Sequence, residues 1–460
     1  MRLKSVTLSN FRCFDRLEVN FHSRLTVFVG INGAGKTALL DAIAAGLTPV
    51  LRHLSSANQR LSTEGAGLKD SDFKLVNRGN DRWTVADYAQ VIVKTDDDLE
   101  WDYWRAASSG KVPELRPEGG KLAAVMKEIS ESKSGSTPRL MPVFAYYGAQ
   151  RGRIVVPERL RQTKEKYDHP TSALVGALDS LSDFKEMLKW FDLAETSELR
   201  TNKGRPETDF ARSPALEAVR QTIVRLLGDQ YKNPYFNSDH RFVVEKTETN
   251  APMQVMQLSQ GYQSMLALAM DFARRLSLGN PHLTEADREH LAPANSEPIA
   301  PLAGAANVLP ALLAPAIMLV DELDLHLHPT WQQRVLGDLM AAFPNTQFIV
   351  TTHSPQILTT VPDECIRVID GGQLFSAPPG TQGAEPARLL KQVLGVPELR
   401  PDLAITRDLK EYLALVDEDK WATPRALELR RILDDNFKGH EPDLIDADLR
   451  IDNRRWELGE

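Results

Sequence analysis

The chain has few of the features that mark secreted, membrane-embedded or zinc-stapled proteins. It contains only two cysteines, Cys13 and Cys365, which supply neither a disulfide framework nor the paired spacing of a zinc site. No apolar run approaches the length that spans a bilayer, and the first residues show no signal-peptide pattern. These absences predict a cytoplasmic protein that does not engage a membrane.

Net positive charge is also lacking. The chain carries 55 lysines and arginines against 63 aspartates and glutamates, a formal net charge of −8. This balance argues against a generally basic nucleic-acid coat, but a local basic patch can still bind phosphates. We find no internal repeat, and no helical segment sustains the heptads of a coiled coil. At 460 residues, the chain is long enough for two or three domains.

Hydrophobic patterning predicts an α/β fold. Residues 24–30 form a continuous apolar run that stops at a glycine, and residues 316–320 form a second, as buried strands do. Residues 83–96 and 99–107 are predicted to form two strands of an antiparallel meander. Residues 154–230 are mostly helical in pattern.

Three shorter segments carry weaker signals. Residues 54–80 are polar and are predicted to form a loop, and residues 331–343 are predicted to form one helix. Residues 365–375 contain two glycines between apolar runs, which predicts a hairpin. The last eighty or so residues carry separate helical patterns.

A glycine-rich loop follows the first buried strand and precedes a helical pattern. Residues 30–37 match G-x-x-x-x-G-K-[ST] in this strand–loop–helix setting. Such a loop turns its N–H groups toward a phosphate, and the new helix adds its partial positive charge. We therefore predict ATP binding, with Lys36 on the β- and γ-phosphates and Thr37 on Mg²⁺. The predicted nucleotide-binding residues of the loop are Asn32, Gly33, Ala34, Gly35, Lys36 and Thr37.

Two acids end the second apolar strand. Asp321 is placed beside the phosphate loop, where it can hold Mg²⁺ through water, and Glu322 is the candidate general base for a water attacking the γ-phosphate. His353 follows the next predicted strand, 353 − 321 = 32 residues later, so the two strand ends should be neighbours. His353 can then donate a hydrogen bond to the γ-phosphate. The predicted catalytic residues are Lys36, Glu322 and His353.

A further motif carries a resemblance to a known family. Residues 258–263 read L-S-Q-G-Y-Q at the start of a helical pattern and resemble the LSGGQ signature of ABC ATPases, from which Gln260 and Tyr262 depart. The resemblance implies that Ser259 and Gly261 contact the γ-phosphate of ATP held by another subunit. It therefore implies a homodimer formed through the ATPase heads, with a higher oligomer left open.

Two more residues are candidates within this resemblance. Gln150 follows a predicted strand and resembles the loop glutamine that approaches Mg²⁺, although a surface glutamine is the alternative. Arg12 lies in N-F-R-C-F, which resembles an N-terminal element of the RecF and SMC class where a basic residue lies near the nucleotide. A solvated surface arginine is the alternative there. The segment D-L-H-L-H-P after Glu322 resembles the D-loop, and its histidines lack further metal ligands nearby.

The motif order resembles the RecF/OLD branch of SMC-like ABC-type ATPases. This implies an ATPase head with a mixed sheet around the phosphate loop, an antiparallel β lobe, a helical insertion and a helical C-terminal region. An OLD-type nuclease domain would need a cluster of acids on strands, which the C-terminal region lacks, so intrinsic nuclease activity is not expected. The predicted regions are an N-terminal ATPase lobe, a helical insertion, a C-terminal ATPase lobe and a helical assembly or partner-binding region, at 1–153, 154–245, 246–375 and 376–460.

The chain as a whole resembles the PtuA-like ATPase subunits of Septu and the ATPases of some retrons, including Ala145-Tyr146-Tyr147-Gly148 and the helical tail. The resemblance implies an anti-phage role, a separate HNH-type nuclease partner, and a nucleic acid ligand such as DNA or reverse-transcribed DNA/RNA. The alternative is a RecF-like DNA-repair ATPase without a dedicated nuclease.

Overall fold

The computed structural model describes most of the chain, in two compact units, Met1–Gly395 and Val396–Glu460. The four-region division stays a prediction. The described residues are 1–55, 61, 66–79, 81–108, 110–117, 120–131, 139–152, 167, 169–180, 184–228, 230–291 and 308–458.

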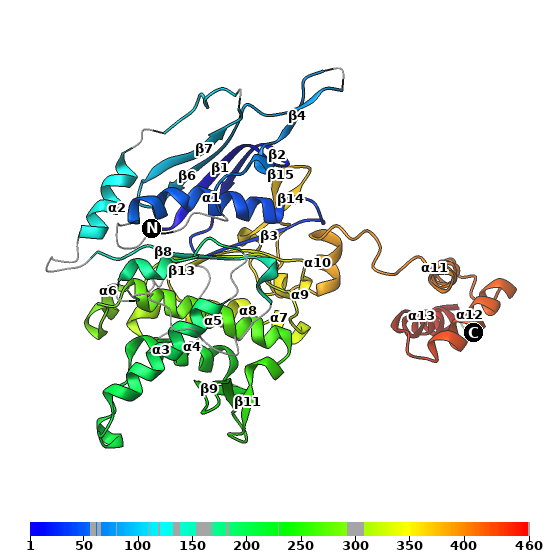
Figure 1. The fold of residues 1–460 in the computed structure, drawn as a ribbon. Coiled ribbons are helices and arrows are strands. Elements are labelled where there is room, and N and C mark those ends of the chain that lie inside the picture. The colour runs from blue at the N-terminus through cyan, green and yellow to red at the C-terminus, as the bar shows by residue number, and fades with distance from the viewer. Residues whose placement is uncertain are drawn as a thin grey trace. The chain divides into compact units, whose positions relative to one another are not determined.

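A six-stranded sheet runs through the larger unit (Figure 1). Neighbouring strands are parallel except for the antiparallel pair β14–β15, which confirms the predicted hairpin. In sheet order the strands are β15 Gln373–Ser376, β14 Ile366–Asp370, β3 Leu25–Val29, β13 Thr346–Thr351, β12 Ala316–Val320 and β8 Val143–Tyr147.

Both faces of this sheet are buried, which explains the unbroken apolar runs in its central strands. On β12, Ile317 and Leu319 pack into one hydrophobic core, while Met318 and Val320 pack into another on the opposite face. This follows from the alternation of side chains along a strand. The sheet therefore holds its polar strand ends on a rigid, doubly covered platform.

One face is covered by helix α1 Lys36–Leu54 and by an antiparallel sheet beyond it (Figure 1). The strand order of this second sheet is β2-β1-β6-β7. Its strands are β1 Leu3–Phe11, β2 Phe14–Asn20, β6 Tyr88–Thr95 and β7 Glu100–Ala106. The short helix α2 Lys121–Glu131 follows this sheet in the chain.

The structure corrects one strand prediction here. The segment predicted as a single strand over residues 83–96 is split into β5 Trp83–Val85 and β6, and β5 pairs instead with β4 Leu75–Asn77. Ala86 lies between β5 and β6 in the chain, and its N–H donates to the Lys74 carbonyl just before β4. This bond helps to pair residues 83–85 with β4 in a separate two-stranded ribbon. The predicted loop over residues 54–80 accordingly contains a strand.

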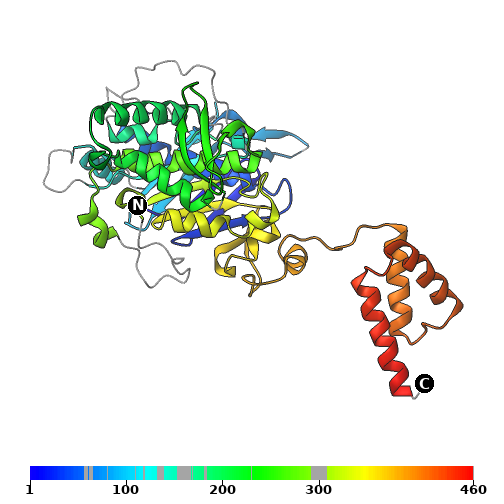
Figure 2. The same ribbon diagram turned by 90° about the horizontal axis from the view of Figure 1, so that it is seen from below.

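Helices cover the opposite face of the central sheet, and Figure 2 looks at the molecule from that side. The helix predicted over residues 331–343 is two helices, because the chain turns at Gln333 and Arg334. In the larger unit, the α-helices that follow α2 along the chain are α3 Lys185–Thr201, α4 Pro214–Leu227, α5 Gln260–Gly279, α6 Arg288–Leu291, α7 Pro329–Gln332, α8 Val335–Ala342, α9 Pro355–Leu358 and α10 Pro386–Gln392.

A small antiparallel sheet lies next to α4, with the order β11-β10-β9. Its strands are β9 Tyr231–Phe236, β10 Phe242–Lys246 and β11 Pro252–Gln254. The region predicted as a helical insertion therefore contains strands as well as α3 and α4.

The smaller unit is a three-helix bundle of α11 Ala404–Asp417, α12 Pro424–Phe437 and α13 Pro442–Leu458 (Figure 2). Leu409 and Tyr412 of α11 pack with Leu429 and Leu433 of α12 in a hydrophobic core of its own. The predicted helical character of the C-terminal region is thus confirmed. In the described part of the chain, no helix has both the length and the apolar character needed to cross a membrane.

Candidate nucleotide-binding site

The phosphate loop connects β3 to α1 and curls as the motif requires. Gly33 and Gly35 adopt φ angles of 81° and 103°, which residues other than glycine rarely adopt. A Cβ at Gly35 would lie 2.7 Å from Cys13 Sγ and 2.7 Å from the Phe14 ring. Gly35 is the N-cap of α1, so the helix opens directly beneath the loop and can hold an anion there.

The Lys36 ammonium lies inside this loop. Its Nζ donates to the carbonyls of Gly30 and Ile31, at 2.9 and 3.0 Å. Burial lowers the pKa of Lys36, while the nearby carboxylates, Asp321 first among them, act in the opposite direction. A buried cation held by backbone oxygens is well placed to bind phosphate oxygens.

Asp321 lies between two threonine hydroxyls at the carboxyl end of β12. Thr37 Oγ1 donates to its Oδ2 at 2.8 Å, and Thr351 Oγ1 donates to its Oδ1 at 2.6 Å. Asp321 is 1% exposed. Thr37 belongs to α1 and Thr351 to β13, while Asp321 directly follows β12. The predicted position of Asp321 beside the phosphate loop is therefore confirmed.

These oxygens fit a magnesium ion. Mg²⁺ prefers hard oxygen ligands and typically binds one or two protein carboxylates together with waters and nucleotide phosphates. The Thr37 hydroxyl and the Asp321 carboxylate supply that chemistry side by side. Among the described residues, no group of three or more His, Cys, Asp or Glu side chains is arranged to hold a metal ion.

Glu322 adopts an unusual backbone conformation. Its φ is 49°, in the left-handed region, and its N–H donates to Thr351 Oγ1 at 2.7 Å. A non-glycine residue stays in this region only where the surrounding structure imposes the conformation, and such residues are enriched at functional sites. Its side chain lines the same 280 Å³ pocket as Lys36, Thr37 and Asp321.

His353 lies at the end of β13, which pairs in parallel with β12. The predicted adjacency of the two strand ends is therefore confirmed. His353 lines the phosphate-loop pocket together with Asn32 and Gly33. Its backbone N–H donates to Asp324 Oδ1 at 3.2 Å, and Thr352 Oγ1 donates to the same oxygen at 2.5 Å. Asp324 thus couples the segment after the acidic strand to the histidine.

The signature residues belong to a different pocket. Ser259 is the N-cap of α5, and it lines a cavity of about 800 Å³ with Gly261, His326 and Trp331. A Cβ at Gly261 would lie 2.5 Å from the His326 carbonyl oxygen, so this glycine lets the D-loop-like segment pack against the helix start. Neither Ser259 nor Gly261 lines the pocket of the phosphate loop.

The two remaining candidates lie outside the phosphate-loop pocket. Gln150 is exposed, on the short 3-10 helix Ala149–Gly152 that follows β8. Arg12 donates to Asp41 of α1 at 2.7 Å and to Asp72 at 2.9 Å. Although burial alone lowers it, these hydrogen bonds and charges leave the pKa of Arg12 raised. The ion pair with Asp41 therefore holds Arg12 against α1.

Sequence reasoning missed Cys13 and Ala38, which line the pocket, and Thr351, which lies behind it. Cys13, next to Arg12, lines it directly. Thr351 bridges the Glu322 N–H and the Asp321 carboxylate. The T-T-H-S segment at a strand end was the available signal for Thr351, and the N-F-R-C-F element around Arg12 was the available signal for Cys13.

Comparisons with known proteins assign this chain to a family. A family model described as "AAA domain" matches residues 5–227, and one described as "AAA domain, putative AbiEii toxin, Type IV TA system" matches residues 128–359, about half of the chain. The chain is similar to the Retron Ec83 probable ATPase of Escherichia coli, at 29% identity over 99% of this chain and 88% of that protein.

Two further likenesses are more limited. The Septu protein PtuA of Bacillus thuringiensis is 34% identical over 22% of this chain and 28% of its own length. The SMC head domain from Thermotoga maritima matches with a TM-score of 0.38 and 15% identity, covering 82% of this chain and all of that domain. With its phosphate loop, acidic strand end and full-length retron relative, the chain belongs to the AAA-domain family of the second model and is an SMC/RecF-like ABC-type ATPase related to the anti-phage retron and PtuA ATPases.

Proposed function

We propose that this protein binds and hydrolyses ATP between two copies of its head, and that it serves as the regulatory subunit of an anti-phage defence complex. The observation that carries the proposal is the separation of two half-sites. Lys36, Asp321 and Glu322 share one pocket, whereas Ser259 and Gly261 share another. A single head therefore offers its signature helix to a nucleotide other than its own.

Within one composite site, each residue has a distinct task. Lys36 and the loop N–H groups bind the β- and γ-phosphates. The Thr37 hydroxyl and the Asp321 carboxylate would hold a Mg²⁺ ion, which would supply positive charge beside the phosphates. Glu322 accepts the proton of the attacking water, and His353 orients the γ-phosphate. Ser259 of a second copy completes the phosphate shell at the N-terminus of its α5.

A mixing experiment tests the shared site. Lys36→Ala removes the phosphate-loop cation, and Ser259→Arg blocks the signature, so neither mutant homodimer has an intact composite site. Random reassortment gives about half heterodimers, each with one intact site out of two, so about a quarter of wild-type turnover should return. Absence of any recovery, when heterodimers are demonstrated by tagged co-purification, would refute sharing between subunits.

The defence role rests on the full-length similarity to a retron ATPase and the partial similarity to PtuA. We propose an HNH-type nuclease as the partner, controlled by ATP-dependent closure of the heads. Purification from the native operon followed by mass spectrometry tests this. Recovery of a nuclease or a reverse transcriptase supports the defence role, whereas a protein that purifies alone and acts on DNA breaks favours the RecF-like repair alternative.

A further inference from the structure

A glutamine side chain bridges the two pockets of one head. Gln332 is the last residue of α7, and it lines neither pocket itself. Its Nε2 donates to the Leu327 carbonyl at 2.9 Å, and its Oε1 accepts from Ser354 Oγ at 2.7 Å. Leu327 lines the pocket of the signature residues, and Ser354 directly follows His353, which lines the phosphate-loop pocket. The Gln332 amide therefore links a segment of one half-site to a segment of the other.

The end of the bridge at Ser354 has supports of its own. Ser354 is 4% exposed, and its Oγ accepts from the Ile357 N–H at 3.1 Å as the N-cap of α9. Its N–H donates to Thr352 Oγ1 at 3.0 Å, and Thr352 Oγ1 donates to Asp324 at 2.5 Å. The turn that carries His353 is therefore held by several hydrogen bonds besides the one to Gln332.

The other end of the bridge lies against the signature helix. A Cβ at Gly261 would lie 2.5 Å from the His326 carbonyl oxygen, so the segment around His326 packs directly on the first turn of α5. His326 has a φ of 62°, a conformation that a non-glycine residue keeps only where its surroundings impose it. The bond from Gln332 to the neighbouring Leu327 carbonyl helps to impose it. Loss of that bond should therefore release this segment more than the turn at the opposite end of the bridge.

We propose that Gln332 is a positioning residue for ATP hydrolysis, and that it acts on the nucleotide held by the other copy. By holding residues 326–327 against the start of α5, it fixes the signature half-site that its own head presents. The inference rests on the shared site proposed above and adds to it a residue that lines neither pocket.

Glutamine suits this place because its amide donates and accepts at the same time. A glutamate at this position could still accept from Ser354 Oγ, but it could not donate to the Leu327 carbonyl. Gln332→Glu therefore breaks the bridge at the signature end and leaves the shape of the side chain almost unchanged.

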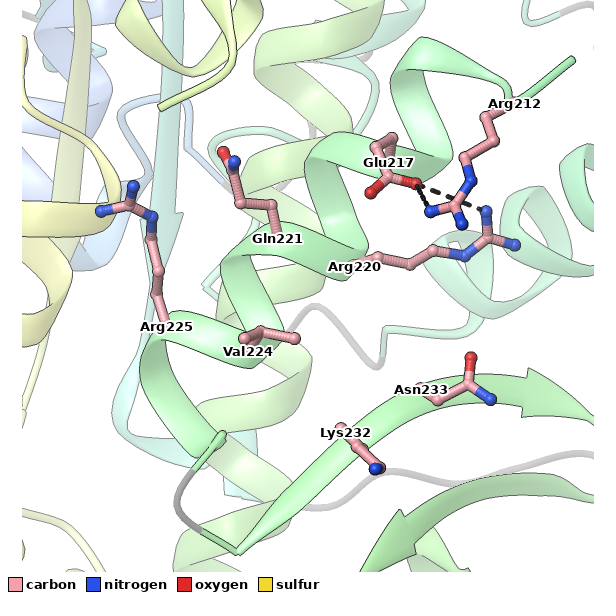
Figure 3. Close-up of a pocket in the computed structure, with 8 residues that line it drawn as sticks. All are labelled: Arg212, Glu217, Arg220, Gln221, Val224, Arg225, Lys232 and Asn233. Carbon is pink, nitrogen blue, oxygen red and sulfur yellow. Dashed lines mark hydrogen bonds and ion pairs between the residues drawn. The ribbon is translucent and has the colours of Figure 1, made fainter. Parts of the chain in front are cut away.

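Two controls in the full-length protein make the same change elsewhere. Gln333→Glu alters the next residue in the chain, whose Nε2 donates to Gln356 Oε1 at 2.6 Å on the exposed surface. Gln221→Glu places the same charge at another half-buried glutamine, which lies on α4 in a pocket that shares no residue with either half-site (Figure 3).

Each variant is measured on each side of a heterodimer that has one intact composite site. When Lys36→Ala is mixed with Ser259→Arg, that site combines the phosphate loop of the Ser259→Arg copy with the signature of the Lys36→Ala copy. With Gln332→Glu on the copy that supplies the signature, ATP turnover should fall at least about fivefold, the factor that corresponds to one ordinary hydrogen bond. With Gln332→Glu on the copy that holds the nucleotide, turnover should stay within about twofold of the parent mixture. Neither control should move either mixture beyond that range.

This contrast separates positioning from a general loss of folded protein, because a copy that folds poorly lowers both mixtures alike. Gln332→Met, which loses both hydrogen bonds at similar length, should give the same contrast. Equal turnover of the two Gln332→Glu mixtures would overturn the proposal, and so would an equal fall caused by either control on the signature-supplying copy. A parent mixture that recovers no turnover would instead refute the shared site, and the inference that rests on it would fall with it.

Discussion

The charge network inside the helical layer offers a sharp test of how the signature helix is held. Asp271 of α5 accepts from Arg274 at 2.7 Å, Arg275 at 2.6 Å and the Tyr147 hydroxyl at 2.9 Å. All three charged side chains are at most 4% exposed. Arg275 also donates to the carbonyls of Ala173 and Val175. The network therefore ties α5, which begins beside Ser259, to β8 and its neighbouring segment.

Asp271→Asn should destabilise the larger unit by about 3–5 kcal/mol, because it leaves two buried guanidinium groups without their counter-charge. The matched control is Asp338→Asn, which changes another i,i+4 partner of an arginine, but in a pair that is 39% and 28% exposed. That change should cost less than about 1 kcal/mol. Urea unfolding monitored by tryptophan fluorescence measures both values.

The same network predicts a pH dependence. Burial acts to raise the pKa of Asp271, but the charges and hydrogen bonds of Arg275 and Arg274 lower it to about 2, from 3.8. A lowered folded-state pKa contributes stability above the unfolded value and loses it as the pH falls toward 2. The loss is about 2–3 kcal/mol for this group. If Asp271→Asn is no less stable than Asp338→Asn, the network does not hold the helix. The same conclusion follows if Asp271→Asn loses as much free energy of unfolding as the wild type between about pH 4 and pH 2, the window set by these two pKa values.

Three further predictions concern the nucleotide site and the C-terminal unit. Glu322→Gln should keep ATP binding while lowering the rate of phosphate release by about 10²–10⁴-fold, and unchanged turnover would exclude Glu322 as the base. Gly35→Ala should weaken the binding of a fluorescent ATP analogue, because its Cβ meets Cys13 and its φ is 103°. Gly395→Ala, where the Cβ meets nothing within 4 Å despite a φ of 71°, is the control, and equal affinity of the two variants would contradict the steric reasoning. Deletion of residues 396–460 should leave nucleotide binding intact but abolish higher assembly or nuclease recruitment. Light scattering and a pull-down with the operon partner decide this, and normal assembly of the truncated protein would count against it.

Elements with a local signal were predictable. The buried strands β3 and β12 follow from unbroken apolar runs, and the hairpin β14–β15 follows from Gly371-Gly372 between two short segments that mix apolar and polar residues. The errors arose where tertiary hydrogen bonds decided the outcome. The split between β5 and β6 depends on the bond from Ala86 to Lys74, a contact between distant residues that no pattern within either segment reveals.

The sequence by itself determined the phosphate-handling parts of this protein. The loop around Lys36 and the acids Asp321 and Glu322 could be read directly, because strand–loop–helix chemistry lies within a few consecutive residues. Only the tertiary structure decided which side chains meet across the chain. It placed Thr351 on Asp321 and brought the Gln332 amide between segments of both pockets. Such contacts depend on how separate elements pack, and that packing is set by the whole core rather than by any local pattern.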